Sequence, residues 1–327
     1  PCYSHIGYVN QYKIIVDNSV KNIITEETTM NKKLTEIYKS LSGGEGLKHF
    51  SYSQLSSYKP ISMWLVDYVC RTQTQRRKDK KGYKLGFGSV ANNTAQKLIG
   101  KYYFEGAERH EIKDRDYNKI YKFEFNEYLK GAKDDEDRLK RENIQSYIHK
   151  TIENILSAVK NIFGNKELSC ERYVGLIIKD VLIGMTGRID FESFNSIAEC
   201  KTKPPSVKDF KDSFRTYSQA LPKTPDEDNI TQLSFYHLAT DKTPFLFYAN
   251  DKDFIIFDDT HEKLKKDFME YKLELLFNKA RTVQRLLIVS NGDPKIMAGL
   301  VERPNTNHWT MNDASEEQLS IIKQLWG

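Results

Sequence analysis

The sequence of 327 residues has no long apolar run, little proline and few cysteines. No stretch approaches the roughly 20 consecutive apolar residues that a membrane-spanning helix needs, so we do not expect an integral membrane protein. The N-terminus lacks a basic segment followed by an apolar run, so no secretory signal is expected. Nine prolines and 17 glycines are too few for a largely disordered chain, and this length can bury a sizeable core.

Motifs for several kinds of chemistry are also missing. The four cysteines, Cys2, Cys70, Cys170 and Cys200, form no Cys-x-x-Cys pair, which disfavours a zinc ribbon and favours a reduced, cytoplasmic protein. The seven histidines form no His-x-x-x-His or His-x-Glu arrangement, which disfavours a zinc hydrolase. No Gly-x-x-x-x-Gly-Lys-Ser/Thr segment occurs, so an ATP-driven partner would have to be a separate chain.

Charge is nearly balanced, because 50 basic and 45 acidic residues give a net charge of +5. Seven basic residues nevertheless gather between Arg71 and Lys84, with Asp79 as the single acid among them. A run of this kind favours contact with the phosphates of a nucleic acid, and a solvated loop is an equally good interpretation. The residues expected to make such contacts are Arg76, Arg77, Lys78, Lys80 and Lys81.

The apolar pattern predicts helices at both ends and a β-rich centre. Residues 1–45 are polar and are expected to be an N-terminal extension that ends at a glycine-rich break. Residues 46–327 are expected to form one domain, with a helical part at about 46–165, a core at about 169–258 and C-terminal helices at about 259–327. The expected strands are 173–178, 181–189, 196–201, 245–248 and 254–257. With a helix at about 229–239, this order favours an α/β core with helical additions.

The chemically informative residues lie on two of these strands. Alternation puts Glu199 and Lys201 on one face of their strand, and Asp190 reaches that face if the two strands pair as a hairpin. Mg²⁺ takes oxygen ligands and needs only one or two carboxylates beside a phosphate. Asp190, Glu199 and the backbone carbonyl of Cys200 are the expected ligands. Lys201 is expected to orient or help deprotonate a metal-bound water.

As bare spacing this pattern is weak, because an Asp, a Glu and a Lys within 12 residues occur by chance in most proteins of this composition. The apolar strands around it strengthen it, since an unpaired charge in such a setting is costly. A second element is the pair Gln232 and Tyr236, which are four residues apart and share one face of the expected helix. They could bind a nucleic-acid backbone or position the phosphate that is cleaved, or they could be a half-buried surface pair.

Taken in their order along the chain, these motifs resemble those of the PD-(D/E)XK nuclease superfamily, in its RecB-like exonuclease branch. Glu199-Cys200-Lys201 and the segment that ends at Asp190 are similar to its two metal-binding motifs. Gln232 and Tyr236 are similar to its helical Gln/Tyr motif, and Glu171 to the acidic residue of its first core strand. Nearer the N-terminus, the segment that includes Ser51 and Ser53 is similar to the serine-rich helix start of the branch. The segment that ends at Asn92 is similar to its helical motif.

The resemblance implies a restriction-endonuclease-like core, which is a small mixed sheet flanked by helices. It implies a Mg²⁺- or Mn²⁺-dependent exodeoxyribonuclease that acts on linear DNA from an end, with a separate single-strand-binding or annealing protein as a partner. A site-specific or structure-specific endonuclease, or a catalytically silent nucleic-acid-binding module, would share this core. The further residues expected at the DNA are Ser51, Ser53, Arg188 and Lys203.

The Lys201-Thr202-Lys203 continuation is similar to that of viral and mitochondrial genome-maintenance exonucleases, and a phage-encoded enzyme would act in the host cytoplasm. Two departures from the branch matter. The first is Asn92, which stands where a metal-binding histidine is common and is a weaker ligand for a divalent cation. Asn92 and Glu171 are secondary candidates for metal ligands. No cysteine follows Cys200, so no iron–sulfur cluster is expected.

Overall fold

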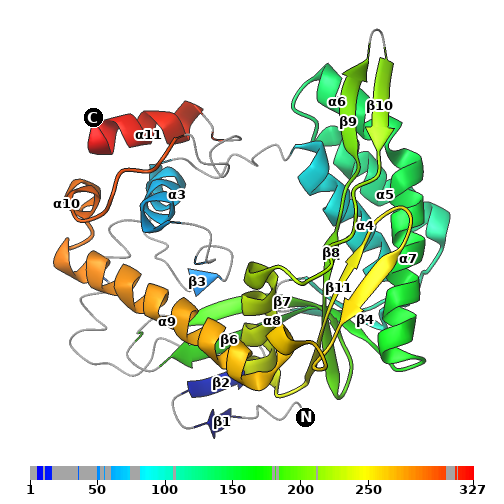
Figure 1. Cartoon of the computed structure of the whole chain (residues 1–327), viewed down its shortest axis with the longest axis horizontal. Coiled ribbons are helices and arrows are strands. Elements are labelled where there is room, and N and C mark those ends of the chain that lie inside the picture. Colours follow the sequence, from blue (N-terminus) through cyan, green and yellow to red (C-terminus); the bar gives the residue numbers. More distant parts are fainter. Residues whose placement is uncertain are drawn as a thin grey trace. The chain divides into compact units, whose positions relative to one another are not determined.

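The computed structural model describes residues 6–9, 12–16, 36, 50–51, 55, 60–73, 82–105, 108–178, 181, 184–210, 213–306, 314 and 316–327. The chain is mixed α/β, with helices on the flanks of a mixed sheet (Figure 1). Seven strands of the sheet follow the order β1-β2-β6-β7-β8-β11-β12, and β3, β4 and β5 pair beside this path. It forms two compact units, of which the second comprises Asp79–Tyr173 and Arg188–Met269. None of the helices in the described part combines the length and apolarity needed to cross a bilayer.

Four helices form the first part of the second unit. They are α4 (Tyr83–Ile99), α5 (Tyr117–Lys130), α6 (Asp135–Asn143) and α7 (Gln145–Phe163). The side chains of Asp116 and Asp134 cap α5 and α6 by accepting hydrogen bonds from backbone N–H groups. On α7 the isoleucines at 148, 152 and 155 repeat every three or four residues, so one face is fully buried. α4 packs against both α5 and α7.

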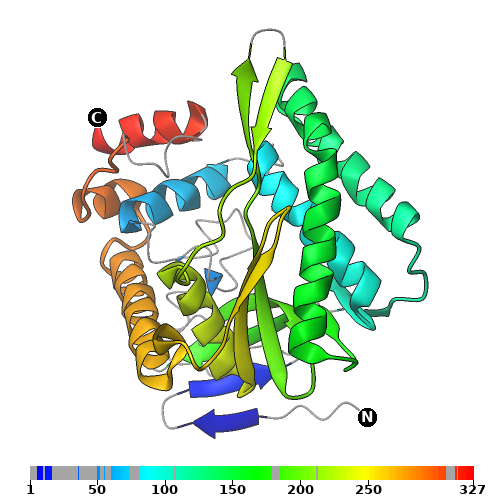
Figure 2. The same ribbon diagram turned by 45° about the vertical axis from the view of Figure 1, so that its right-hand side comes forward.

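The strands that carry the candidate residues pair through short connections. They are β6 (Ser169–Ile178), β7 (Met185–Glu192), β8 (Ser196–Thr202), β11 (Thr243–Ala249) and β12 (Phe254–Phe257). β7 and β8 pair antiparallel. β8 and β11 pair parallel, and the helix α8 (Glu227–Thr240) lies between them along the chain. Figures 1 and 2 show α7 and α8 on opposite sides of β8 and β11. Successive side chains of β8 therefore point alternately toward the α7 side and the α8 side of the sheet.

Two short hairpins complete this unit. One is β4 (Tyr102–Glu105) with β5 (Glu108–Glu111), and the other is β9 (Ser206–Phe210) with β10 (Ser213–Tyr217). β4 also pairs with β6, whereas β9 and β10 form a separate two-stranded sheet. The sequence analysis predicted none of these four strands.

The other unit comprises Pro1–Lys78, Val174–Gly187 and Glu270–Gly327. Its elements are β1 (Ile6–Val9), β2 (Tyr12–Val16), β3 (Phe50–Ser51), α3 (Ile61–Gln73), α10 (Pro294–Gly299), α11 (Glu316–Trp326) and most of α9 (Lys266–Val289), which follows the short 3₁₀ helix η2 (Glu262–Leu264). α3 packs against α10 and α11, and the Gln318 amide donates to the Asp67 carboxylate at 3.0 Å. β2 pairs antiparallel with the C-terminal half of β6.

Most expected core elements are confirmed, with two corrections. The strand expected at 181–189 begins only at Met185 and continues to Glu192, because Phe191 and Glu192 pair with β8. Asp190 therefore lies inside a strand and not at its end. Ser51 belongs to β3, which pairs with β7, so the expected helix does not include it. Ser53 lies outside the described residues, and the extension at 1–45 and the single domain at 46–327 stay predictions.

Candidate functional site

The candidate site is built around the point where the ladder between β7 and β8 stops. The ladder pairs Phe191 with Ala198, and the next backbone N–H of β8 that points toward β7 is that of Cys200. This N–H donates to the side chain of Asp190 at 2.8 Å. The other oxygen of Asp190 accepts a hydrogen bond from the Asn92 side chain of α4 at 3.1 Å. A partly buried carboxylate thus takes the place of ladder bonds between the two strands.

α4 approaches β8 closely because a glycine stands at position 88. A Cβ atom there would meet the hydroxyl oxygen of Thr202 at 2.8 Å, which is closer than real Cβ contacts allow. Gly88 therefore lets the helix lie against the strand. One and two turns further along the same helix face, Asn92 and Gln96 reach the candidate site.

Glu199 and Lys201 share one face of β8, as alternation predicted. The Lys201 ammonium donates to Glu199 Oε1 at 2.7 Å and to the side-chain oxygen of Gln232 on α8 at 2.8 Å. The carboxylate of Glu199 is buried, whereas the side chain of Lys201 is 28% exposed. The hairpin therefore places a carboxylate and an ammonium group side by side, with the ammonium group reaching solvent.

Gln232 and Tyr236 share a face of α8, as predicted, and they act together. The Gln232 amide donates to the Tyr236 hydroxyl at 2.8 Å, and the backbone N–H of Arg188 donates to the same hydroxyl at 3.2 Å. Tyr236 is only 2% exposed. The arrangement favours a positioning role for both residues. Tyr236 fixes the side chain of Gln232 by a hydrogen bond, and Gln232 fixes the ammonium group of Lys201 by another.

Glu171 on β6 is the third carboxylate of the site, and it is buried. One oxygen accepts from the Gln96 amide at 2.7 Å, and the other pairs with the Arg188 guanidinium at 2.5 Å. Its backbone has φ of +60°, a left-handed conformation that a glutamate rarely adopts and that is often found at functional sites. Glu171 is a weaker metal-ligand candidate than the other two carboxylates, because a guanidinium cation already neutralises it. The oxygens of Asp190 accept only from uncharged N–H groups, and one oxygen of Glu199 has no partner.

Gln96 is a site residue that the sequence analysis missed. It is fully buried, and its amide also donates to the backbone carbonyl of Asp190 at 3.1 Å. The signal was present in the sequence, because Gly88, Asn92 and Gln96 repeat every four residues and therefore lie on one face of the helix.

Burial and mutual repulsion make these carboxylates hard to ionise. Burial and the neighbouring charge of Asp190 raise the pKa of Glu199 to about 8 and that of Glu171 to about 7. Burial also raises the pKa of Asp190, although Lys201 and the Cys200 N–H favour its charged form. For Lys201, burial alone would lower the pKa, but Glu199 and Asp190 outweigh it, so the net shift is upward. Lys201 is therefore a cation at neutral pH.

The oxygen atoms available here fit a hard divalent cation. Three buried oxygens lack a hydrogen-bond partner, namely Oε2 of Glu199, Oδ1 of Asn92 and Oε1 of Gln96. Mg²⁺ binds through one or two carboxylates and keeps several waters. No group of three or more His, Cys, Asp or Glu side chains that could hold a metal occurs in the described part of the chain. An ion would thus be held by Asp190 and Glu199 with amide or backbone oxygens, and the Cys200 carbonyl stays a predicted ligand.

Of the residues expected to contact DNA, only Arg188 and Lys203 belong to the described part of the unit that holds the candidate site. Arg188 has a half-exposed side chain although it pairs with Glu171. Lys203 follows β8, and its ammonium lies 5.6 Å from the centre of the Tyr248 ring. Ser51 lies in β3, in the other unit. The remaining residues lie outside the described ones: Ser53, Arg76, Arg77, Lys78, Lys80 and Lys81.

The raised pKa values predict how stability depends on pH. The pKa of Glu199 is about 8 in the folded chain against an ordinary value of 4.5, so between these pH values the folded state binds more protons than the unfolded state. The free energy of unfolding of the metal-free protein should therefore fall as pH rises from about 5 to 8. Glu199→Gln should lose much of this dependence. Melting temperatures of both proteins at pH 5.5 and 8 test this, and parallel curves would contradict it.

No family model, curated protein or solved structure matches this chain. The interpretation of the site therefore depends on its own geometry.

Proposed function

We propose that this protein is a Mg²⁺- or Mn²⁺-dependent nuclease with a PD-(D/E)XK core, which hydrolyses DNA phosphodiester bonds from an end. The observation that carries the proposal is the cluster of Asp190, Glu199 and Lys201, in which one carboxylate oxygen of Glu199 is buried without a partner. Buried carboxylates that raise each other's pKa are costly to ionise, and such sites are often functional.

Asp190 and Glu199 would hold the divalent cation, with Asn92 as a further oxygen donor. When bound, such a cation polarises a phosphate oxygen and lowers the pKa of a bound water. Lys201, as an ammonium group, stabilises negative charge that develops on the phosphate. Because its pKa is raised, Lys201 is suited to donate hydrogen bonds and not to remove the proton from water.

The rest of the site keeps these groups in place. Gln232 accepts one hydrogen bond from Lys201 and donates another to Tyr236, which also accepts from the backbone of β7. The order of the motifs along the chain supports the exonuclease assignment. Arg188 and Lys203, both near the cluster in sequence, are the proposed contacts to DNA.

Linear and covalently closed circular DNA of the same sequence test the proposal. With Mg²⁺ or Mn²⁺, the protein should degrade the linear form and leave the circle intact, and excess EDTA should stop the reaction. Cutting of the circle would indicate an endonuclease with the same core. Binding without cleavage under every metal condition would indicate a silent binding module, and robust cleavage in EDTA would contradict the metal site.

A further inference from the structure

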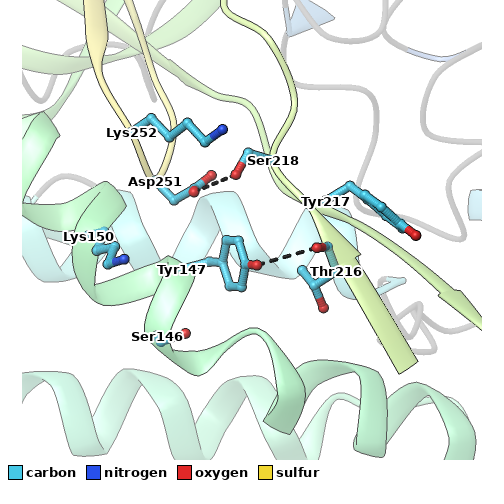
Figure 3. A pocket seen from close by; sticks show the side chains of 8 residues that line it. All are labelled: Ser146, Tyr147, Lys150, Thr216, Tyr217, Ser218, Asp251 and Lys252. Carbon is cyan, nitrogen blue, oxygen red and sulfur yellow. Dashed lines mark hydrogen bonds between the residues drawn. The ribbon is translucent and has the colours of Figure 1, made fainter. Parts of the chain in front are cut away.

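A second polar feature lies at the far end of β8 and β11. It is a pocket of about 550 Å³, formed by the beginning of α7, the end of β10 and the turn that follows β11. Figure 3 shows Tyr147 and Lys150 from α7, Ser218 after β10, and Asp251 and Lys252 from the turn. All of these residues belong to the unit that holds the candidate site.

The pocket carries an excess of positive charge. Lys150 and Lys252 are exposed, and no hydrogen bond or ion pair joins either ammonium group to another described residue. The single acid, Asp251, accepts a hydrogen bond from the Ser218 hydroxyl at 2.6 Å, while its other oxygen has no partner. Two ammonium groups and one carboxylate give a net charge of about +1.

Aromatic and hydroxyl groups line the space between these charges. The Tyr147 hydroxyl donates to the backbone carbonyl of Thr216 at 3.4 Å, which joins α7 to the end of β10. Ser146 and Tyr147 belong to the first turn of α7, and the residue before this helix makes no side-chain capping bond.

The register of the sheet places the pocket relative to the candidate site. Lys201 pairs with Tyr248 and Thr202 with Ala249, so Asp251 and Lys252 follow just beyond the ends of both strands. The pocket therefore lies just beyond the C-terminal ends of β8 and β11, close along these strands to Lys201.

We infer that this pocket binds one backbone phosphate of the nucleic-acid strand that the candidate site cleaves. The inference rests on the proposed function. A backbone phosphate is favoured over a free phosphate, because the strand holds it near the pocket at high effective concentration.

Binding of a labelled oligonucleotide in EDTA tests the pocket without cleavage. Lys150→Gln/Lys252→Gln should weaken binding about tenfold and flatten the slope of log affinity against log salt by about one, because one neutralised phosphate is lost. The matched control is Lys122→Gln/Lys160→Gln, which changes two exposed lysines on α5 and α7 that do not line the pocket. It should leave both quantities unchanged. The cleavage rate at saturating DNA should also be unchanged in the pocket variant.

Neutral methylphosphonate linkages, placed one at a time along the strand, locate the phosphate. One position should weaken binding to the wild-type protein and have no effect on the pocket variant. If the wild-type protein binds and cleaves DNA but the pocket variant keeps its affinity and salt slope, the inference is wrong and the proposed function stands. If the wild-type protein does neither, both are wrong. Calorimetric binding of inorganic phosphate that depends on the lysines, with strand affinity unchanged, would also overturn the inference.

Discussion

Glu199→Gln is expected to lower the single-turnover rate of DNA cleavage by about 10³-fold or more. The substitution keeps the shape of the side chain and removes the charge that would attract a divalent cation. It should leave the fold intact, because the amide can still accept a hydrogen bond from Lys201 and it removes the repulsion between Glu199 and Asp190. In the metal-free protein at pH 8, the melting temperature should be equal or higher, since an ionised buried carboxylate has been lost.

Glu192→Gln is the matched control for this experiment. Glu192 is also a buried glutamate in the same hairpin, but it pairs with Arg172 and Lys242 and does not contact the candidate site. Its neutralisation should lower the melting temperature, because two cations lose their anionic partner. The folded variant should still cleave DNA. An active Glu199→Gln variant, or a Glu192→Gln variant that is folded but inactive, would show that catalysis does not depend on the proposed cluster.

The central strands and α8 could be predicted because their signals are local. The apolar run at 196–201 and the hairpin around the turn at 250–253 have the alternation and turn residues that such strands require. The common face of Gln232 and Tyr236 follows from helical spacing alone. Each of these features depends on neighbours within a few residues along the chain.

The rest of the site could not be predicted in this way. The contact between Asn92 and Asp190 joins residues 98 positions apart, and that between Gln96 and Glu171 joins residues 75 apart. No local pattern specifies the left-handed backbone of Glu171, which an L-residue adopts only when surrounding contacts stabilise it. β9 and β10 are mostly polar, so their pairing leaves little trace in the hydrophobic pattern.

Lys201→Met is the second substitution with a large expected effect. It keeps an unbranched side chain of similar length and removes the ammonium group that contacts Glu199 and Gln232. The cleavage rate at saturating DNA and metal should fall by about 10²–10³-fold, because negative charge on the phosphate loses its nearest cation. Lys203→Met is the control, because this lysine lies two residues further along and makes none of these contacts. It should weaken DNA binding without a comparable loss of rate.

The pH dependence of metal binding tests whether Lys201 acts through its charge or only as a structural side chain. Lys201 lowers the pKa of Glu199, so its removal should raise that pKa above the value of about 8 that the intact site gives. Since a carboxylate must be deprotonated to bind the ion, Mn²⁺ affinity should be weaker at pH 7 in Lys201→Met and should recover by about pH 9. Calorimetric titrations at the two pH values measure this. Equal Mn²⁺ affinities of wild type and variant at pH 7 would mean that Lys201 does not control the charge of Glu199, and its ammonium would then act on the phosphate alone.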